Sequence, residues 1–369
     1  MTISANKGDH SEVLALLRIL HQGEIPIADK NGKPLKSRLK VVSLYRPSDK
    51  GQKYEIGDDS VRVVNELGLE IALVSRDKIK NLSDNLLKEI RTLSGRSFVC
   101  LSTDEASKIL HFSGSKASSS EKADLFLEIA SPVFEGETSS LGFSVKSELG
   151  ALPTLLNAGA TKFEYRIDDC SADKAFIVQE ELPKSEKKDY PGPSLLLPAL
   201  TNSHAKIVFE SVVSPIFEQN LKMIDSAFPR ILADTLKHSY ISGEGSLNKV
   251  VKSTALIDEL TEALSIPRAN VERLVPHKIK ELLRQSALGM NPGRPWEGQT
   301  EAHGGWIIVK EDGSVVCFHL DNDDEFRDFL LENTKFDTPS MTRHEAGYIY
   351  KDEGTNKAKL RLSLQIRLD

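Results

Sequence analysis

The chain has 369 residues, of which 39% are hydrophobic and 28% are charged, and its formal net charge is −6. This composition is that of an ordinary globular protein with two or three domains, and the negative charge argues against a general polyanion binder. No apolar run approaches the roughly 20 residues that span a bilayer, and the first residues contain no secretory apolar region. The cysteines Cys100, Cys170 and Cys317 are spaced for neither a disulfide framework nor a zinc site. We therefore expect a cytoplasmic protein with reduced thiols and no membrane segment.

The first hundred residues combine a helix, strands and a basic stretch. Residues 11–24 predict an amphipathic helix, because their apolar residues recur at helical spacing. Residues 39–46 have the pattern of a strand. The surrounding segment 28–53 carries eight Lys or Arg residues against two Asp residues. This run indicates a solvated face, or a locally positive surface on a chain of negative net charge.

Two apolar strands that follow this region carry polar groups on one face. They span residues 124–130 and 141–147 and are joined by a turn-rich segment, so they predict a β-hairpin. Because strand side chains alternate between faces, Asp124 and Glu128 share one face of the first strand. Lys146 projects from one face of the second strand. If the strands pair, two carboxylates and a lysine gather on one surface.

Such a surface has the groups that phosphodiester hydrolysis needs. A carboxylate such as that of Asp124 holds Mg²⁺ together with neighbouring oxygens. An adjacent lysine, here Lys146, orients water or helps to deprotonate it, and offsets the negative charge that grows on the phosphate. The alternative, an ordinary surface salt bridge between Asp and Lys, stays open from the pattern alone.

The next part of the chain passes from short elements to long helices. Residues 154–159 predict a short helix that starts after Pro153. Residues 162–167 and 175–182 have strand character. From about residue 205 to residue 290 the apolar residues follow helical spacing, which predicts several helices.

The last part returns to strands. Residues 305–320 predict a hairpin with Asp312 and Gly313 at its turn. Residues 324–333 predict a short helix. In residues 357–368 apolar and polar side chains alternate, which predicts a terminal strand with one apolar and one basic face.

Familiar catalytic signatures are absent from the chain. It contains no P-loop, no dinucleotide-binding glycine motif, no nucleophile elbow and no zinc-protease motif. The nine histidines are scattered without the spacing of metal ligands. The surface around Asp124 and Lys146 therefore remains the leading candidate for chemistry.

Long strings of the sequence resemble the HpaII-type restriction endonucleases. The resemblance spans nearly the whole chain and is weakest in its helical middle. It implies a type II restriction enzyme of the PD-(D/E)xK nuclease class, which uses Mg²⁺ to hydrolyse duplex DNA. The resembling strings are residues 16–46, 122–129, 142–165, 318–354 and 359–368.

The resemblance implies an α/β fold of the α+β kind, in which helices flank a mixed central β-sheet as in restriction endonucleases. In this chain we expect a mostly helical insertion. The expected regions are a basic N-terminal part (1–110), a catalytic core (111–200), a helical part (201–295), and a strand-rich part (296–369) that completes the core and contacts DNA.

The resemblance also implies roles for three residues. Asp124 is the metal-binding aspartate, Lys146 is the motif lysine, and Ser144 occupies the position that usually holds Asp or Glu. The sequence departs from the class pattern in two ways, because Ala123 replaces a proline and Ser144 replaces the second carboxylate. A hydroxyl carries no charge, so another carboxylate has to supply it.

Four glutamates are candidates for this second carboxylate. Glu128 comes first because it shares a strand face with Asp124, although residues four apart on a strand lie about 13 Å apart. Glu89 comes second because nuclease folds can donate a glutamate from the preceding helix. Glu148 and Glu164 follow because they are near in sequence.

Base readout is expected in the polar segment 333–344, which lies within a resembling string. Specific contacts to guanine favour Arg and Lys, and contacts to adenine favour Asn and Gln. The alternative that Arg343 only holds this loop in place stays open. The residues expected to contact DNA are Asn333, Lys335, Arg343 and His344.

The function implied by the resemblance is Mg²⁺-dependent hydrolysis of double-stranded DNA at a short palindromic site, C/G-rich like CCGG. A palindromic target favours a homodimer, and the alternative of a monomer that nicks the two strands in turn stays open. We expect a cognate DNA methyltransferase to act on the same site without a stable complex. Two alternatives stay open. One is a DNA-binding protein with a decayed nuclease site, which Ser144 favours. The other is a metal-dependent hydrolase of a small phosphoester, which fits the negative charge.

Overall fold

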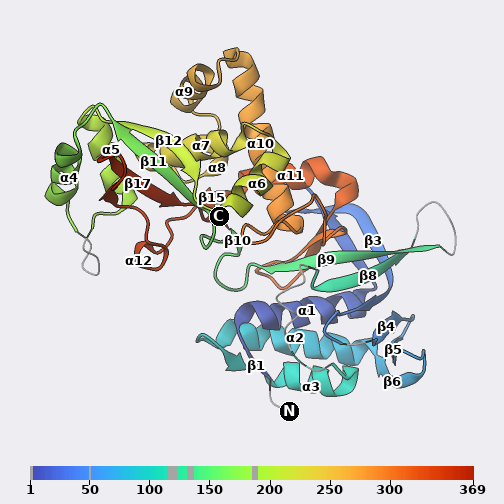
Figure 1. Ribbon diagram of the computed structural model, residues 1–369. Helices are drawn as coiled ribbons and strands as arrows, with labels where there is room; N and C mark the ends of the chain where they lie inside the picture. Colours follow the sequence, from blue (N-terminus) through green and yellow to red (C-terminus); the bar gives the residue numbers. More distant parts are fainter. Residues whose placement is uncertain (1–2, 50, 113, 115–122, 131–136, 185–189) are drawn as a thin grey trace. The chain divides into compact units, whose positions relative to one another are not determined.

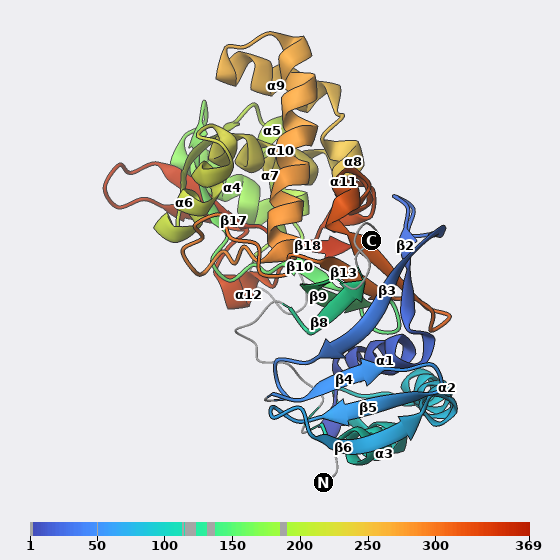
Figure 2. The same ribbon diagram turned by 90° about the vertical axis from the view of Figure 1, so that its right-hand side faces the viewer.

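The computed structural model describes residues 3–49, 51–112, 114, 123–130, 137–184 and 190–369. The chain forms two compact units, each with helices and sheets of its own (Figures 1 and 2). Unit 1 comprises Met1–Pro153, Ala287–Gly289 and Thr300–Phe329, and unit 2 comprises Thr154–Ser286, Met290–Gln299 and Leu330–Asp369. The residues of the expected catalytic core, 111–200, are divided between the two units.

Unit 1 is built on a nine-stranded mixed sheet. Its strands, in spatial order, are β2 (Glu24–Ala28), β14 (Val315–His319), β13 (Gly305–Val309), β9 (Thr138–Ser147), β8 (Leu125–Ala130), β3 (Pro34–Tyr45), β4 (Lys53–Ile56), β5 (Ser60–Val64) and β6 (Glu70–Ser75). The pairs β13–β9 and β14–β2 are parallel, and the other neighbours are antiparallel. The mixed sheet expected from the sequence is thus present. A separate short sheet pairs β1 (Ser4–Ala5) with β7 (Phe98–Val99).

Three helices pack side by side against one face of this sheet (Figures 1 and 2). They are α1 (Lys7–Gln22), α2 (Arg76–Thr92) and α3 (Leu101–Leu110). Helix α1 confirms the helix predicted at residues 11–24. It starts at a capping box between Asn6 and Asp9, which satisfies free backbone N–H groups, and it stops at Gly23, whose φ of 68° suits glycine.

The two hairpins predicted from the sequence are both present in unit 1. Strand β8 alternates buried and half-buried residues and pairs with β9, so that Leu125 faces Phe143. The segment that joins these strands lies in part, at residues 131–136, outside the described residues. Strands β13 and β14 form the second hairpin. Its Gly305 has a φ of 114°, and a Cβ there would lie 1.9 Å from the carbonyl oxygen of Phe318.

Unit 2 holds two smaller sheets and most of the helices. Its four-stranded sheet has the order β12 (Lys206–Val212), β11 (Lys162–Asp168), β17 (Ala358–Ser363) and β16 (Ile349–Lys351). Its three-stranded sheet has the order β10 (Thr154–Leu156), β18 (Ile366–Leu368) and β15 (Thr334–Phe336). The helices predicted between residues 205 and 290 are confirmed from Pro215 onward, but the first part of that stretch, Lys206–Val212, forms strand β12 because it pairs with β11.

The remaining helices follow α3 along the chain. They are α4 (Ala172–Glu181), α5 (Pro193–Asn202), α6 (Pro215–Ile224), α7 (Phe228–Ser242), α8 (Leu247–Val250), α9 (Thr254–Leu264), α10 (Arg268–Leu288), the 3₁₀ turn η1 (Leu320–Asn322), α11 (Asp323–Glu332) and α12 (Met341–His344). Helix α11 confirms the short helix predicted near residue 324. Within the described residues, no helix is both long enough and apolar enough to cross a membrane.

Three further predicted elements are wrong. Residues 154–156 form strand β10, because they find a partner in β18 that is distant in sequence. Residues 172–181 form helix α4, whose first turn is capped by the side chain of Ser171. The terminal alternating segment is two strands, β17 and β18, in different sheets. Its apolar residues are nevertheless buried, as predicted.

Candidate active site

The pairing of β8 with β9 fixes the carboxylate of Asp124. Asp124 directly precedes β8, and its backbone N–H donates to the carbonyl oxygen of Phe143, 2.8 Å away. Its Oδ2 accepts hydrogen bonds from the backbone nitrogen of Val145, at 2.7 Å, and from Ser144 Oγ, at 3.1 Å. The hairpin therefore brings Asp124 beside the start of the segment that carries Ser144 and Lys146, as the sequence predicts.

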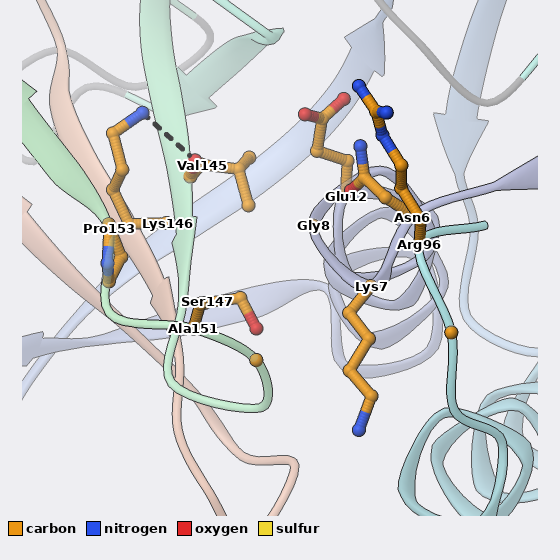
Figure 3. Close-up of a pocket in the computed structure, with 12 residues that line it drawn as sticks. Asn6, Lys7, Gly8, Glu12, Arg96, Val145, Lys146, Ser147, Ala151 and Pro153 are labelled. Carbon is orange, nitrogen blue, oxygen red and sulfur yellow. Dashed lines mark hydrogen bonds between the residues drawn. The ribbon is translucent and has the colours of Figure 1, made fainter. Parts of the chain in front are cut away.

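Lys146 is held to the same group. Its Nζ donates to Ser144 Oγ at 2.6 Å. It also donates to the carbonyl oxygen of Val145 at 3.1 Å (Figure 3). The ammonium also lies 5.5 Å from the ring centroid of Trp306 on β13, within the range of a cation–π contact. Because Ser144 is only 3% exposed, its hydroxyl is a buried bridge that ties the lysine to the aspartate.

Glu12, in the first turns of α1, is a carboxylate that the sequence patterns did not single out. The pKa of Glu12 is raised from 4.5 to about 8, mainly by burial and also by the negative charges of Asp124 and Asp9, while the positive charges of Lys146 and Arg46 act in the opposite direction. The charges of Asp124 and Lys146 act on Glu12 in this way because the three side chains lie in one region of unit 1. Figure 3 shows Glu12 on the wall of the cavity that faces β9.

Two contacts hold the first turns of α1 in position. Ser147 Oγ, on β9, donates to Ser11 Oγ at 2.9 Å. On another side of the helix, the fully buried ring of His10 bonds Thr103 Oγ1 at 2.9 Å and the carbonyl oxygen of Phe98 at 3.1 Å. The helix that carries Glu12 is therefore clamped between β9 and the segment around β7 and α3.

A cavity of about 440 Å³ opens between α1 and β9 (Figure 3). Its polar lining includes the carboxyl group of Glu12 and the cations of Lys7, Arg96 and Lys146. The complete lining is Asn6, Lys7, Gly8, Glu12, Gly95, Arg96, Val145, Lys146, Ser147, Gly150, Ala151 and Pro153.

Arg46 adds a buried cation to this region. It follows β3 and is 3% exposed, and one guanidinium nitrogen donates to the carbonyl oxygen of Gly114 at 3.0 Å. The guanidinium also pairs with Asp49 at 3.5 Å and lies 5.0 Å from the ring centroid of Phe112. Its second terminal nitrogen has no hydrogen-bond partner among the described residues.

The glutamates predicted from the sequence have other partners. Glu128 accepts hydrogen bonds from Lys53 Nζ at 2.8 Å and Ser43 Oγ at 2.6 Å. Although burial favours its neutral form, these bonds hold the pKa of Glu128 below its usual value. Glu128 is thus paired with Lys53 of β4, and its role as the second carboxylate stays a prediction.

The three lower-ranked glutamates are also committed elsewhere. Glu89 accepts hydrogen bonds from the backbone and hydroxyl groups of Ser102, in the first turn of α3. Glu148 pairs with Lys310. Glu164 lies in unit 2, where Tyr350 and Arg361 donate to its carboxylate.

The residues predicted to contact DNA all lie in unit 2, near the chain's C-terminus. Lys335 Nζ pairs with the side chain of Asp369 at 2.6 Å, and the backbone nitrogen of Asp369 donates to the carbonyl oxygen of Asn333 at 2.7 Å. Arg343 and His344, on α12, line a second cavity of about 460 Å³. The same cavity is lined by Asn157, Ala158, Gly159, Asp337, Thr338, Ser340, Gln365 and Arg367.

The sequence contains one sign that could have identified Glu12. Residues 13–17 of α1 are all apolar, and a helix with such an unbroken apolar run is buried on most sides. A charged residue next to that run is less free to face solvent than one on an amphipathic helix. The helical periodicity alone did not reveal this.

The similarity to known proteins covers both units. A model of the HpaII restriction endonuclease family matches residues 6–368. The chain is 33% identical over 367 residues to the type II restriction enzyme HpaII of Haemophilus parainfluenzae, and the match covers 99% of this chain and 98% of that protein. No solved structure matches the chain.

Proposed function

The chain belongs to the HpaII restriction endonuclease family, and we propose that it cuts double-stranded DNA with an active site formed by Asp124, Glu12, Ser144 and Lys146. One observation carries this proposal. Lys146 Nζ, Ser144 Oγ and Asp124 Oδ2 form a continuous hydrogen-bonded chain, and Glu12 stands close enough for its pKa to respond to Asp124 and Lys146. A type II restriction endonuclease is a DNA hydrolase, which supports assigning the hydrolysis of a phosphodiester to this cluster.

The donor set fits Mg²⁺. Asp124 and Glu12 offer carboxylate oxygens, and the carboxyl group of Glu12 accepts no hydrogen bond from the described residues. In that described part of the chain, no group of three or more His, Cys, Asp or Glu side chains could hold a metal ion. Mg²⁺ is commonly held by one or two carboxylates, with water and substrate phosphate oxygens completing its shell. When bound, the ion would supply Lewis-acid stabilisation of the phosphate and acidify a water molecule.

The protein's own groups would perform the remaining tasks. Val145 N–H and Ser144 Oγ orient the Asp124 carboxylate, so that its second oxygen can point to the metal. Ser144 Oγ and the carbonyl oxygen of Val145 hold the Lys146 ammonium in one position. From there Lys146 can orient the attacking water and offset the charge that develops on the phosphate.

Glu12 accounts for the absence of a carboxylate at position 144. The class pattern needs two acidic groups, and this chain would take one from the hairpin and one from α1. A serine at position 144 therefore does not require that the nuclease site has decayed. Through its hydrogen bonds, Ser144 links Asp124 to Lys146.

Further features of the proposal follow from the family. The mixed sheet of unit 1, with helices α1 to α3 on one face, would be a restriction-endonuclease-like PD-(D/E)xK core. Asn333, Lys335, Arg343 and His344 in unit 2 would contact DNA. We further propose a CCGG-like palindromic target, a homodimer and a cytoplasmic location, with a cognate methyltransferase acting on the same site without a stable complex.

Digestion of phage DNA tests the proposed function. The protein is incubated with the DNA and Mg²⁺, and a parallel reaction contains EDTA. Discrete fragments that appear only with Mg²⁺ support the proposal. Intact DNA accompanied by a gel shift contradicts it in favour of a DNA-binding protein, and intact DNA without a shift contradicts DNA as the ligand.

A further inference from the structure

Most of the charged side chains that line the cavity beside the catalytic lysine are positive. Lys7, Arg96 and Lys146 line it with a single carboxyl group, that of Glu12. Lys146 is held by Ser144 and Val145, whereas the side chains of Lys7 and Arg96 form no hydrogen bond or ion pair with any residue that the structure describes. Two unpaired cations in one concave site mark a place for an anionic ligand.

The cations are spread along the cavity and do not converge on one point. Figure 3 shows Lys7 and Arg96 leaving the same wall in opposite directions, and Lys146 standing on the other wall. A compact anion would need its donors to meet around it. Separated cations along a groove instead suit a chain of phosphates.

The rest of the lining leaves room for a polymer backbone. Gly8, Gly95, Gly150 and Ala151 contribute no side chain larger than a methyl group. Glycine at such positions lets another backbone come close. The cavity also lacks the paired Asn, Gln and Arg groups that read base edges, apart from Arg96 and the helix-capping Asn6. Its lining therefore matches a sugar-phosphate backbone better than a base.

We propose that this cavity binds the DNA backbone on one side of the phosphate that is cut, with Lys7 and Arg96 each contacting a flanking phosphate. The inference rests on the proposed function and deepens it. Contacts of this kind set the position of the duplex over Asp124 and Lys146 and carry no sequence information. They would explain how a chain of negative net charge holds DNA at this site.

Salt-dependent binding of short duplexes tests this inference. Wild-type protein, Lys7→Ala, Arg96→Ala and the double variant are titrated with a fluorescent duplex that contains a cut site mapped from wild-type fragments, and with one that lacks it. Ca²⁺ replaces Mg²⁺ to prevent cutting. Lys88→Ala is the matched control, because Lys88 is an exposed lysine on α2 that does not line the cavity.

Each cavity variant is expected to reduce the slope of log affinity against log salt by roughly 1, and the double variant by roughly 2. Both duplexes should lose affinity by the same factor, and Lys88→Ala should change neither quantity. The conservative variants Lys7→Arg and Arg96→Lys should keep the wild-type slope. Thermal melting checks that every variant is folded.

Two results overturn the inference. Unchanged slopes in the cavity variants exclude phosphate contacts by Lys7 and Arg96. Tight binding of inorganic phosphate that depends on both residues, with unchanged duplex slopes, indicates a site for a small anion. Either result leaves the proposed function intact if the wild-type protein cuts DNA. A wild-type protein that neither binds nor cuts DNA contradicts the proposed function itself.

Discussion

In the absence of metal, the replacement Glu12→Gln should increase the free energy of unfolding of the protein. This increase should become larger as the pH rises. The pKa of Glu12 rises from 4.5 to about 8 on folding. At pH values between these two numbers, the folded state holds a proton on Glu12 that the unfolded state has lost. Stability therefore falls as pH rises through this window. At about 1.4 kcal/mol per pKa unit, the cost is about 1 kcal/mol at pH 5.5 and approaches roughly 5 kcal/mol at pH 8.5. Glutamine has nearly the same shape and does not ionise, so it avoids this cost.

Urea unfolding in EDTA at both pH values measures this effect. Both proteins carry Trp296→Phe, which removes the tryptophan of unit 2. The fluorescence of Trp306, which is 1% exposed and belongs to unit 1, then reports on the unit that contains Glu12. The free energy of unfolding of the variant should exceed that of the wild type slightly at pH 5.5. The difference should be several times larger at pH 8.5. An advantage of equal size at both values, or a less stable variant at pH 8.5, would refute the reasoning. Mg²⁺ should then stabilise the wild type more than the variant.

Three further predictions concern the same unit. Lys146→Ala should lower the cleavage rate by roughly 10³-fold or more while duplex affinity stays within a few-fold, and undiminished cleavage would refute the assignment. Ser144→Ala should lower the cleavage rate by only roughly 10- to 100-fold, because each lost hydrogen bond contributes about 1 kcal/mol. The backbone of Val145 still holds both Asp124 and Lys146 in this variant. A loss of cleavage as large as that of Lys146→Ala would contradict this prediction. Gly305→Ala should destabilise unit 1 by roughly 3 kcal/mol or more in urea unfolding, since the new Cβ would lie 1.9 Å from the carbonyl oxygen of Phe318; wild-type stability would contradict the strained backbone.

Local patterns predicted the elements whose residues interact with near neighbours. The alternation in β8 and β9 specified a hairpin, and that hairpin alone determines that Asp124 meets Ser144 and Val145. The apolar spacing of α1 and the glycine at its end specified the helix. Where a segment depends on a remote partner, as β10 depends on β18, the sequence could not predict its conformation. Residues 175–178 are apolar enough for a strand. The side chain of Ser171, however, caps the first turn and thereby stabilises a helix.

The second carboxylate could not be predicted for a different reason. Glu12 and Asp124 are 112 positions apart in sequence, and only the packing of α1 on the sheet brings them together. Glu128 was favoured because it shares a strand face with Asp124, yet its carboxylate is bound by Lys53 and Ser43 from neighbouring strands. The alternation of side chains along a strand predicts which residues can share a surface. It does not predict which charged groups already have partners.

The most direct test of this account compares two glutamate variants in Mg²⁺-dependent cleavage of phage DNA. If Glu12 supplies the carboxylate that Ser144 lacks, Glu12→Gln should lose cleavage by roughly 10³-fold or more and still bind duplex DNA. Glu128→Gln, which removes an ion pair with Lys53, should cut at a rate near that of the wild type. Loss of cleavage in Glu128→Gln with cutting retained in Glu12→Gln would contradict the account.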